Sequence, residues 1–341
     1  MSLVRKILNR FWPRDPCEGG QRVHLAIFGK HPGWDDHIDG LGLDSPRLVE
    51  VKRLIYTQGI GGNVDSGRWD RLDASHRLDE FAHLFLWRFP RDLVAGRIWS
   101  SRDGKGRGHY PMIACGQCCD VPAGWVLDHV LPILEEVEAA CVATRLAQDV
   151  RSALQAARDR LRLLAAEEAP RIPNRRPAEG EGPASGSDSA DIAALLDRPE
   201  MGPNHEGFHR ILYQLQAACG AANERSFLIR VPAGDALPPQ AARRWLTLLE
   251  TLVHAEIPVL LVIPLKGDWM DIILGSEVTV LDVFAMRTRP ASIPLTTDIP
   301  YNLDADFVRQ AQRMTEDLMQ GRSAHAQVRP DFPITSDHCQ T

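Results

Sequence analysis

The chain has 341 residues, of which 44% are hydrophobic and 25% are charged, and its formal net charge is −6. This is the composition of a folded globular protein, and it excludes disordered and fibrous classes. The mild acidic charge gives no general attraction to phosphate backbones or anionic lipid, so nucleic acid is not an expected partner. The sequence holds no run of about eighteen uninterrupted apolar residues, so direct membrane insertion is not expected either.

The first half of the chain predicts a strand, a helix and a group of further strands. Residues 1–20 are a polar lead that we expect to be flexible, and the apolar run at 23–28 predicts a strand. Apolar residues at 3-and-4 spacing predict a helix over 45–59. Three further apolar runs, separated by short polar segments, predict an antiparallel meander with strands at 81–89, 93–100 and 110–117.

The middle of the chain carries the one strong boundary signal. Apolar positions at helical spacing over 126–166 predict one long amphipathic helix, or two in series. Residues 170–190 are rich in Pro, Gly, Ser, Arg and Glu, which is typical of disordered linkers. We therefore predict two halves of one domain at 21–167 and 201–320, a disordered linker or insertion at 168–200, and a loosely ordered tail at 321–341.

In the second half of the chain, segments with helical periodicity alternate with segments typical of strands. Its pattern predicts helices at 207–219, 238–254 and 304–319, and strands at 226–231, 258–265, 269–274 and 278–286. Because neither half alone has enough apolar residues for a core, we expect one shared sheet. The predicted fold class is α/β (α+β), with a mixed, largely antiparallel sheet flanked by helices in a layered sandwich.

The cysteines and the common catalytic patterns indicate neither a disulfide scaffold nor an enzyme. The chain has seven cysteines, and Cys115, Cys118 and Cys119 crowd one predicted strand, where reduced, buried thiols are expected. No GxSxG nucleophile motif, Walker motif or GxGxxG motif occurs. These features predict a cytoplasmic protein without a cofactor.

The first polar cluster follows the first predicted strand, in the segment Phe28 to Ile38. His31, Asp35, Asp36 and His37 are candidate cation ligands, but neighbouring residues of an extended loop point apart, and their spacing is not diagnostic of a metal site. Glycine and proline in the same segment are ordinary turn formers.

The second cluster is the glycine-rich segment Trp99 to Pro111 between two predicted strands. Its glycines, together with Lys105 and Arg107, could cradle a phosphate through backbone amides. However, the segment joins two strands and does not lead into a helix N-terminus, which favours a hairpin loop.

Together the two segments resemble the TagF (ImpM) family of type VI secretion accessory proteins. That family carries a GKxPxxGDF-type motif and, about seventy residues later, an SxDxxGRxxP-type motif. Here Asp35 stands where the family has glycine, His37 replaces an aromatic residue, and one extra residue precedes the final proline. The matching residues are Gly29, Lys30, Pro32 and Asp36 in the first motif, and Ser101, Asp103, Gly106, Arg107 and Pro111 in the second.

The resemblance implies a non-enzymatic, cytosolic regulator or scaffold that acts by protein–protein interaction. Members of the family regulate the secretion apparatus after translation, in a pathway shared with a forkhead-associated scaffold protein, so components of that apparatus are the expected partners. We expect the two segments to lie side by side at one end of the sheet, with Asp36 or Asp103 paired with Arg107 or Lys30.

The alternative hypothesis is a zinc-dependent hydrolase. His205, Glu206 and His209 form a literal HExxH, which in metalloproteases places two imidazoles on one face of a helix with a glutamate as general base. The preceding Gly-Pro-Asn places the motif at the first turn of its helix, and no HxxGxxH extension follows.

Overall fold

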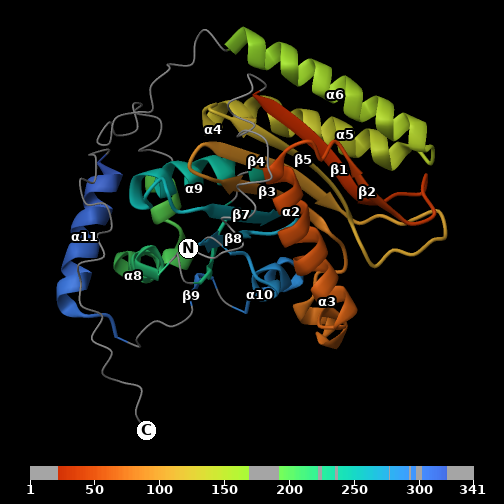
Figure 1. The fold of residues 1–341 in the computed structure, drawn as a ribbon. Coiled ribbons are helices and arrows are strands. Elements are labelled where there is room, and N and C mark those ends of the chain that lie inside the picture. Colours follow the sequence, from red (N-terminus) through yellow and green to blue (C-terminus); the bar gives the residue numbers. More distant parts are fainter. Residues whose placement is uncertain are drawn as a thin grey trace, which may run out of the picture.

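The structure is a computed structural model that describes residues 22–168, 192–221, 225–234, 237–275, 277–291, 293–296 and 302–320. Its centre is one antiparallel sheet with the strand order β2-β1-β5-β4-β3-β7-β8-β6-β9 (Figure 1). The strands are β1 (Val23–Lys30), β2 (His37–Leu41), β3 (Ala82–Arg88), β4 (Asp92–Trp99), β5 (Met112–Cys119), β6 (Phe227–Pro232), β7 (Val259–Pro264), β8 (Trp269–Leu274) and β9 (Leu295–Thr296).

The two halves of the chain share this sheet. Strand β3 from the first half pairs antiparallel with β7 from the second, and Phe85 lies opposite Val262. The predicted meander is present, because β3 pairs with β4, and β4 pairs with β5. Every strand pair in the described part of the chain is antiparallel. The predicted fold class, a sheet flanked by helices, is therefore confirmed.

Helices cover both faces of the sheet (Figure 1). Leu25 and Ile27 of β1 point into one core, whereas Ala26 and Phe28 point into the other, as the period of a strand requires. The first core lies under α4 (Ala123–Trp125), α5 (Leu131–Ala143), α6 (Ala147–Glu168), α8 (Glu206–Ala221), α9 (Pro238–Leu252) and α11 (Ala305–Met319). The second lies under α2 (Pro46–Val51), the π-helix Lys52–Ile60, α3 (Gly61–Asp65) and α10 (Val280–Phe284).

The predicted strand at 278–286 is wrong, because this segment contains α10. Thr279 caps the helix: its Oγ1 accepts a hydrogen bond from the Asp282 N–H at 3.2 Å. In return, the Asp282 carboxylate accepts a hydrogen bond from the Thr279 N–H at 2.7 Å. This capping box fixes a helical start that a short apolar run cannot reveal by periodicity. Two short strands, β2 and β9, were not predicted from the sequence.

The helical segment predicted over 126–166 consists of helices in series, with a break after Ala143. Thr144 adopts an extended conformation, and its Oγ1 accepts a hydrogen bond from the Leu146 N–H at 3.0 Å, so the chain turns before α6 begins. Cys115, Cys118 and Cys119 are buried free thiols on β5, and burial raises the pKa of Cys115 and Cys118.

The predicted linker at 168–200 falls largely outside the described residues, as do the predicted N-terminal lead and the tail. Its last part is described, however, and residues 192–196 are helical. Ile192, Leu195 and Leu196 are buried in the core, so the ordered second half includes residues before the predicted start at 201. No helix in the described ranges is both long enough and apolar enough to cross a membrane.

Candidate functional site

The two motif segments lie side by side at one end of the sheet, as the sequence predicts. The first segment leaves the end of β1, and the second leads into the start of β5. Because β1 and β5 pair antiparallel, with Gly29 opposite Met112, the two loops emerge together. We call residues 29–37 and 101–111 the two-loop surface. Figure 1 shows these loops at the right-hand end of the molecule.

A buried ion pair joins the two segments. The Lys30 ammonium lies 2.5 Å from the Asp103 carboxylate, and the two side chains are only 4% and 0% exposed. Asp103 also accepts hydrogen bonds from Arg107 Nε at 2.7 Å and from the backbone N–H groups of Lys105 and Arg107 at 3.0 and 2.9 Å. Desolvation acts to raise the pKa of Asp103, but the hydrogen bonds from Lys30 and Arg107 outweigh it and hold the pKa well below its usual range.

Arg107 connects the second loop to the first. Its Nη2 donates a hydrogen bond to the Asp35 carbonyl at 2.8 Å and lies 3.5 Å from the Asp36 carboxylate. Two backbone bonds add to this connection, from the Gly104 N–H to the Trp34 carbonyl at 2.7 Å and from the Lys30 N–H to the Pro111 carbonyl at 3.1 Å. The pairing predicted from the sequence is therefore present, and it fixes the shape of both loops.

Two motif glycines meet different demands. Gly29 has a φ of +113°, and a Cβ there would lie 2.3 Å from the Pro111 carbonyl oxygen, so only glycine permits this approach between the two motifs. Gly106 has a φ of +81° in the turn around Asp103, but a Cβ there would meet open space. Gly29 is thus required by packing and by its backbone conformation, and Gly106 by its conformation alone.

His37 lies in a cluster of aromatic rings that the sequence did not reveal. Its ring centroid is 4.8 Å from that of Tyr110 and 5.9 Å from that of Tyr56, which the π-helix Lys52–Ile60 supplies. The Asp36 carboxylate accepts hydrogen bonds from the His37 N–H at 2.8 Å, and it lies 2.9 Å from His37 Nδ1. These two hydrogen bonds lower the pKa of Asp36. Tyr110 donates to the Asp65 carboxylate at 2.7 Å.

His31 is a structural residue and does not face the other candidate cation ligands of its loop. Its side chain is buried, its Nε2 lies 2.9 Å from the Cys141 carbonyl of α5, and its Nδ1 accepts a hydrogen bond from the Gly33 N–H at 3.0 Å. Burial lowers the pKa of His31. Among the described residues, no group of three or more His, Cys, Asp or Glu side chains could hold a metal ion.

The remaining motif residues contribute backbone shape. Pro32 and Trp34 place their carbonyl oxygens against Gly104, where a Cβ would lie 3.1 and 3.2 Å from them. Ser101 is half-buried, and within the described residues its hydroxyl forms no hydrogen bond. Pro111 supplies the carbonyl that accepts from Lys30.

The HExxH segment does not have the geometry that the zinc hypothesis requires. His205 precedes α8, has a φ of +57°, and its Nδ1 lies 3.0 Å from the Leu196 carbonyl. His209 is inside α8 and buried. The two imidazoles therefore do not occupy i and i+4 positions of one helix. Gly207 has a packing role instead, because a Cβ there would lie 3.0 Å from the Glu200 carbonyl oxygen.

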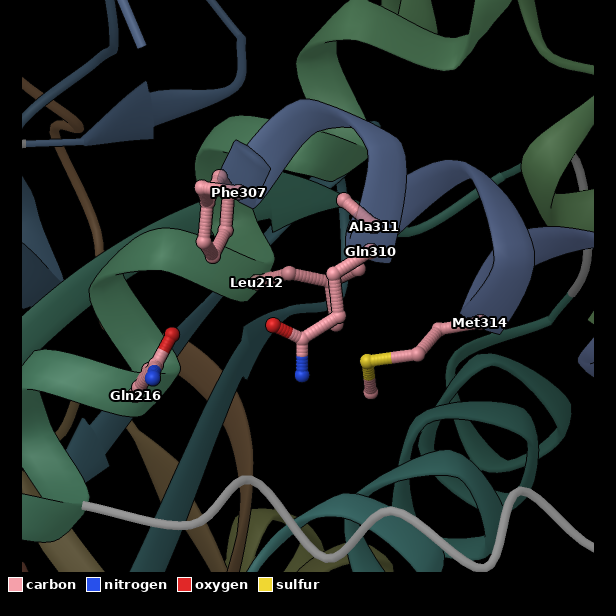
Figure 2. Close-up of a pocket in the computed structure, with 6 residues that line it drawn as sticks. All are labelled: Leu212, Gln216, Phe307, Gln310, Ala311 and Met314. Carbon is pink, nitrogen blue, oxygen red and sulfur yellow. The ribbon is translucent and has the colours of Figure 1, made fainter. Parts of the chain in front are cut away.

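A groove lies between α8 and α11, on the opposite side of the molecule from the two-loop surface (Figures 1 and 2). Its polar groups are two glutamine amides, and it has no charged or nucleophilic side chain, so it offers no catalytic chemistry. It is lined by Leu212, Gln216, Phe307, Gln310, Ala311 and Met314.

Comparison of the chain with models of protein families and with curated proteins finds no match.

Proposed function

We propose that the chain is a non-enzymatic, cytoplasmic regulatory or scaffolding protein of a type VI secretion system, and that it acts by protein–protein interaction at the two-loop surface. The observation that carries the proposal is the physical connection between the two motifs. Residues that match one family pattern, at positions about seventy residues apart, meet in one ion-paired cluster around Asp103.

The arrangement of this cluster suits recognition better than catalysis. Asp103 and Lys30 are buried and satisfy each other, so neither is free to act as a general acid or base. Around them, Asp35, Asp36, Lys105 and Arg107 are exposed on loops whose backbone the buried pair holds. A rigid base that presents charged side chains is what selective docking of a protein partner requires.

The proposed partners are protein components of the secretion apparatus, with a forkhead-associated scaffold protein as the first candidate. The test is to delete and to overproduce the chain in its host, while following assembly of a fluorescent secretion sheath and release of a secreted substrate. We expect both perturbations to change sheath assembly. A Lys105→Glu, Asp35→Lys double variant, which reverses two exposed charges outside the ion-paired cluster, should fold normally and lose the effect.

The outcome that contradicts the proposal is unchanged sheath assembly and secretion under deletion and overproduction alike. The zinc content of the purified protein distinguishes the proposed function from the alternative hypothesis of a zinc-dependent hydrolase. Stoichiometric zinc that disappears in a His205→Ala, His209→Ala double variant would replace the proposed function with a zinc-dependent one.

A further inference from the structure

A third element adjoins the two-loop surface. This is the α5–α6 turn, residues 141–147, which connects the last turn of α5 to the first turn of α6. The His31 ring reaches from the first loop to the Cys141 carbonyl, and a Cβ on Gly33 would lie 2.6 Å from the Ala147 nitrogen. Figure 1 shows the junction of α5 and α6 at the same end of the molecule as the two loops.

The α5–α6 turn presents apolar side chains to solvent. Val142 is 67% exposed and Leu146 is 63% exposed, so this short turn carries two of the large hydrophobic side chains that the described surface leaves open. Trp34 of the first loop is half-buried nearby, and the Arg151 guanidinium lies 5.7 Å from the centre of its ring. Apolar residues that gather beside polar loops mark an interaction site more often than single exposed ones do.

The charge of this end differs from that of the whole chain. Residues 29–37, 101–111 and 141–151 together contain six Lys and Arg but four Asp and Glu, which gives +2, whereas the complete chain carries −6. One of the four carboxylates, that of Asp103, is buried and already paired. Within the described residues, none of Arg102, Lys105 and Arg145 forms an ion pair, although all three are exposed. Asp35 and Asp149 are likewise exposed and form no ion pair among the described residues, so three unpaired cations face two unpaired carboxylates. The end therefore keeps a net positive charge beside the apolar turn.

We propose that the two-loop surface and the α5–α6 turn form one docking surface for an acidic, amphipathic segment of a partner protein. Apolar side chains of that segment cover Val142 and Leu146, and its carboxylates pair with Arg102, Lys105 and Arg145. Charge complementarity selects an acidic segment, and the apolar centre distinguishes it from a nucleic acid, whose phosphates would leave Val142 and Leu146 uncovered. The inference rests on the proposed interaction function but not on the secretion system itself.

The experiment is a selection of short random peptides, displayed on phage, on the purified full-length chain. The peptides recovered should be enriched in Asp and Glu together with Leu, Ile or Phe. A Val142→Ser, Leu146→Ser variant and a Lys105→Glu, Arg145→Glu variant should each bind a selected peptide about tenfold more weakly or worse. Raising the salt concentration should weaken binding to the unmodified chain, because salt screens charge pairs at the rim.

The matched control is a Leu163→Ser, Leu237→Ser variant, in which the replaced side chains are 69% and 68% exposed but lie elsewhere on the surface. It should bind the peptides as the unmodified chain does, and all variants should keep the same melting temperature. Selection of neutral or basic peptides, recovery of no binding peptide, equal binding by the Val142→Ser, Leu146→Ser variant, or tighter binding of an oligonucleotide would each overturn the inference. Unchanged secretion in the host would leave these outcomes unaffected, so the two failures are distinguishable.

Discussion

His31 provides the most informative single substitution, because one buried ring joins the first loop to α5. The last four carbonyl groups of an α-helix have no partner within the helix, and Cys141 belongs to that last turn of α5. His31 Nε2 donates to this carbonyl at 2.9 Å, while Nδ1 accepts from the Gly33 N–H at 3.0 Å. Both bonds require the neutral ring with its proton on Nε2, since a second proton on Nδ1 would oppose the Gly33 N–H.

The cost of His31→Ala follows from these two bonds. The substitution leaves the Cys141 carbonyl and the Gly33 N–H without partners, and each unsatisfied group costs about 1–3 kcal/mol when water cannot replace the lost partner. Because Gly33 is half-buried, water can partly replace the lost partner there. We therefore expect the free energy of unfolding to fall by about 2–4 kcal/mol.

The assay is urea denaturation at neutral pH, followed by tryptophan fluorescence. Two further variants separate the bonds: His31→Gln places an amide nitrogen near the position of Nε2, and His31→Asn places an amide oxygen near that of Nδ1. Each should recover part of the lost stability. His109→Ala is the control, because this exposed histidine of the second loop should contribute within about 0.5 kcal/mol.

A loss of less than about 0.5 kcal/mol in His31→Ala would refute the reasoning, because it would mean that the first loop and α5 are not held together by this ring. Equal stability of the Gln, Asn and Ala variants would refute the assignment of separate roles to the two ring nitrogens.

Three further predictions concern the ion-paired cluster, a buried histidine and the motif glycines. Asp103→Ala leaves the buried Lys30 ammonium group without its carboxylate partner, whereas Arg107→Ala removes a side chain that is 48% exposed. Asp103→Ala should therefore lower the urea midpoint far more than Arg107→Ala does. Similar midpoints for the two variants would contradict this order. Burial lowers the pKa of His83 to about 4. As the pH falls below 6.5, His83 is therefore protonated in the unfolded chain but stays neutral in the folded chain, which favours unfolding. Lowering the pH from 7 to 4 should therefore reduce the free energy of unfolding by about 3 kcal/mol through this group. In the His83→Asn variant, urea denaturation at the two pH values should show a pH dependence that is smaller by this amount. Gly106→Ala should cost about 1–2 kcal/mol, because alanine is strained in the left-handed backbone conformation. Gly29→Ala should cost more, because its Cβ would also clash with the Pro111 carbonyl oxygen. Equal losses of stability in thermal unfolding would show that the backbone moves to relieve this clash.

Much of the fold could be predicted from local pattern. Strands β3, β4, β7 and β8 are long apolar runs with turn residues on either side, so composition and length alone located them to within about two residues. The helix at 238–254 had a regular apolar face, and α9 occupies nearly the same range. The segment 278–286 failed because a short apolar run fits a buried strand and a capped helix equally well, and the cap at Thr279 decided between them.

The candidate site likewise combines features that the sequence predicts with features that only the tertiary structure decides. The sequence by itself predicted that the charged loops follow strand ends and that Asp36 or Asp103 pairs with Arg107 or Lys30, since these expectations depend on residue type and on the positions of the strands. The requirement for glycine at position 29 comes from the approach of Pro111, which is a tertiary contact. Only the tertiary structure decided that Lys30 lies inside and Arg107 outside, and that His31 turns away from Asp36 toward α5. Tyr56 and the α5–α6 turn join this end of the sheet through contacts between residues far apart in the chain, and local periodicity carries no information about such contacts.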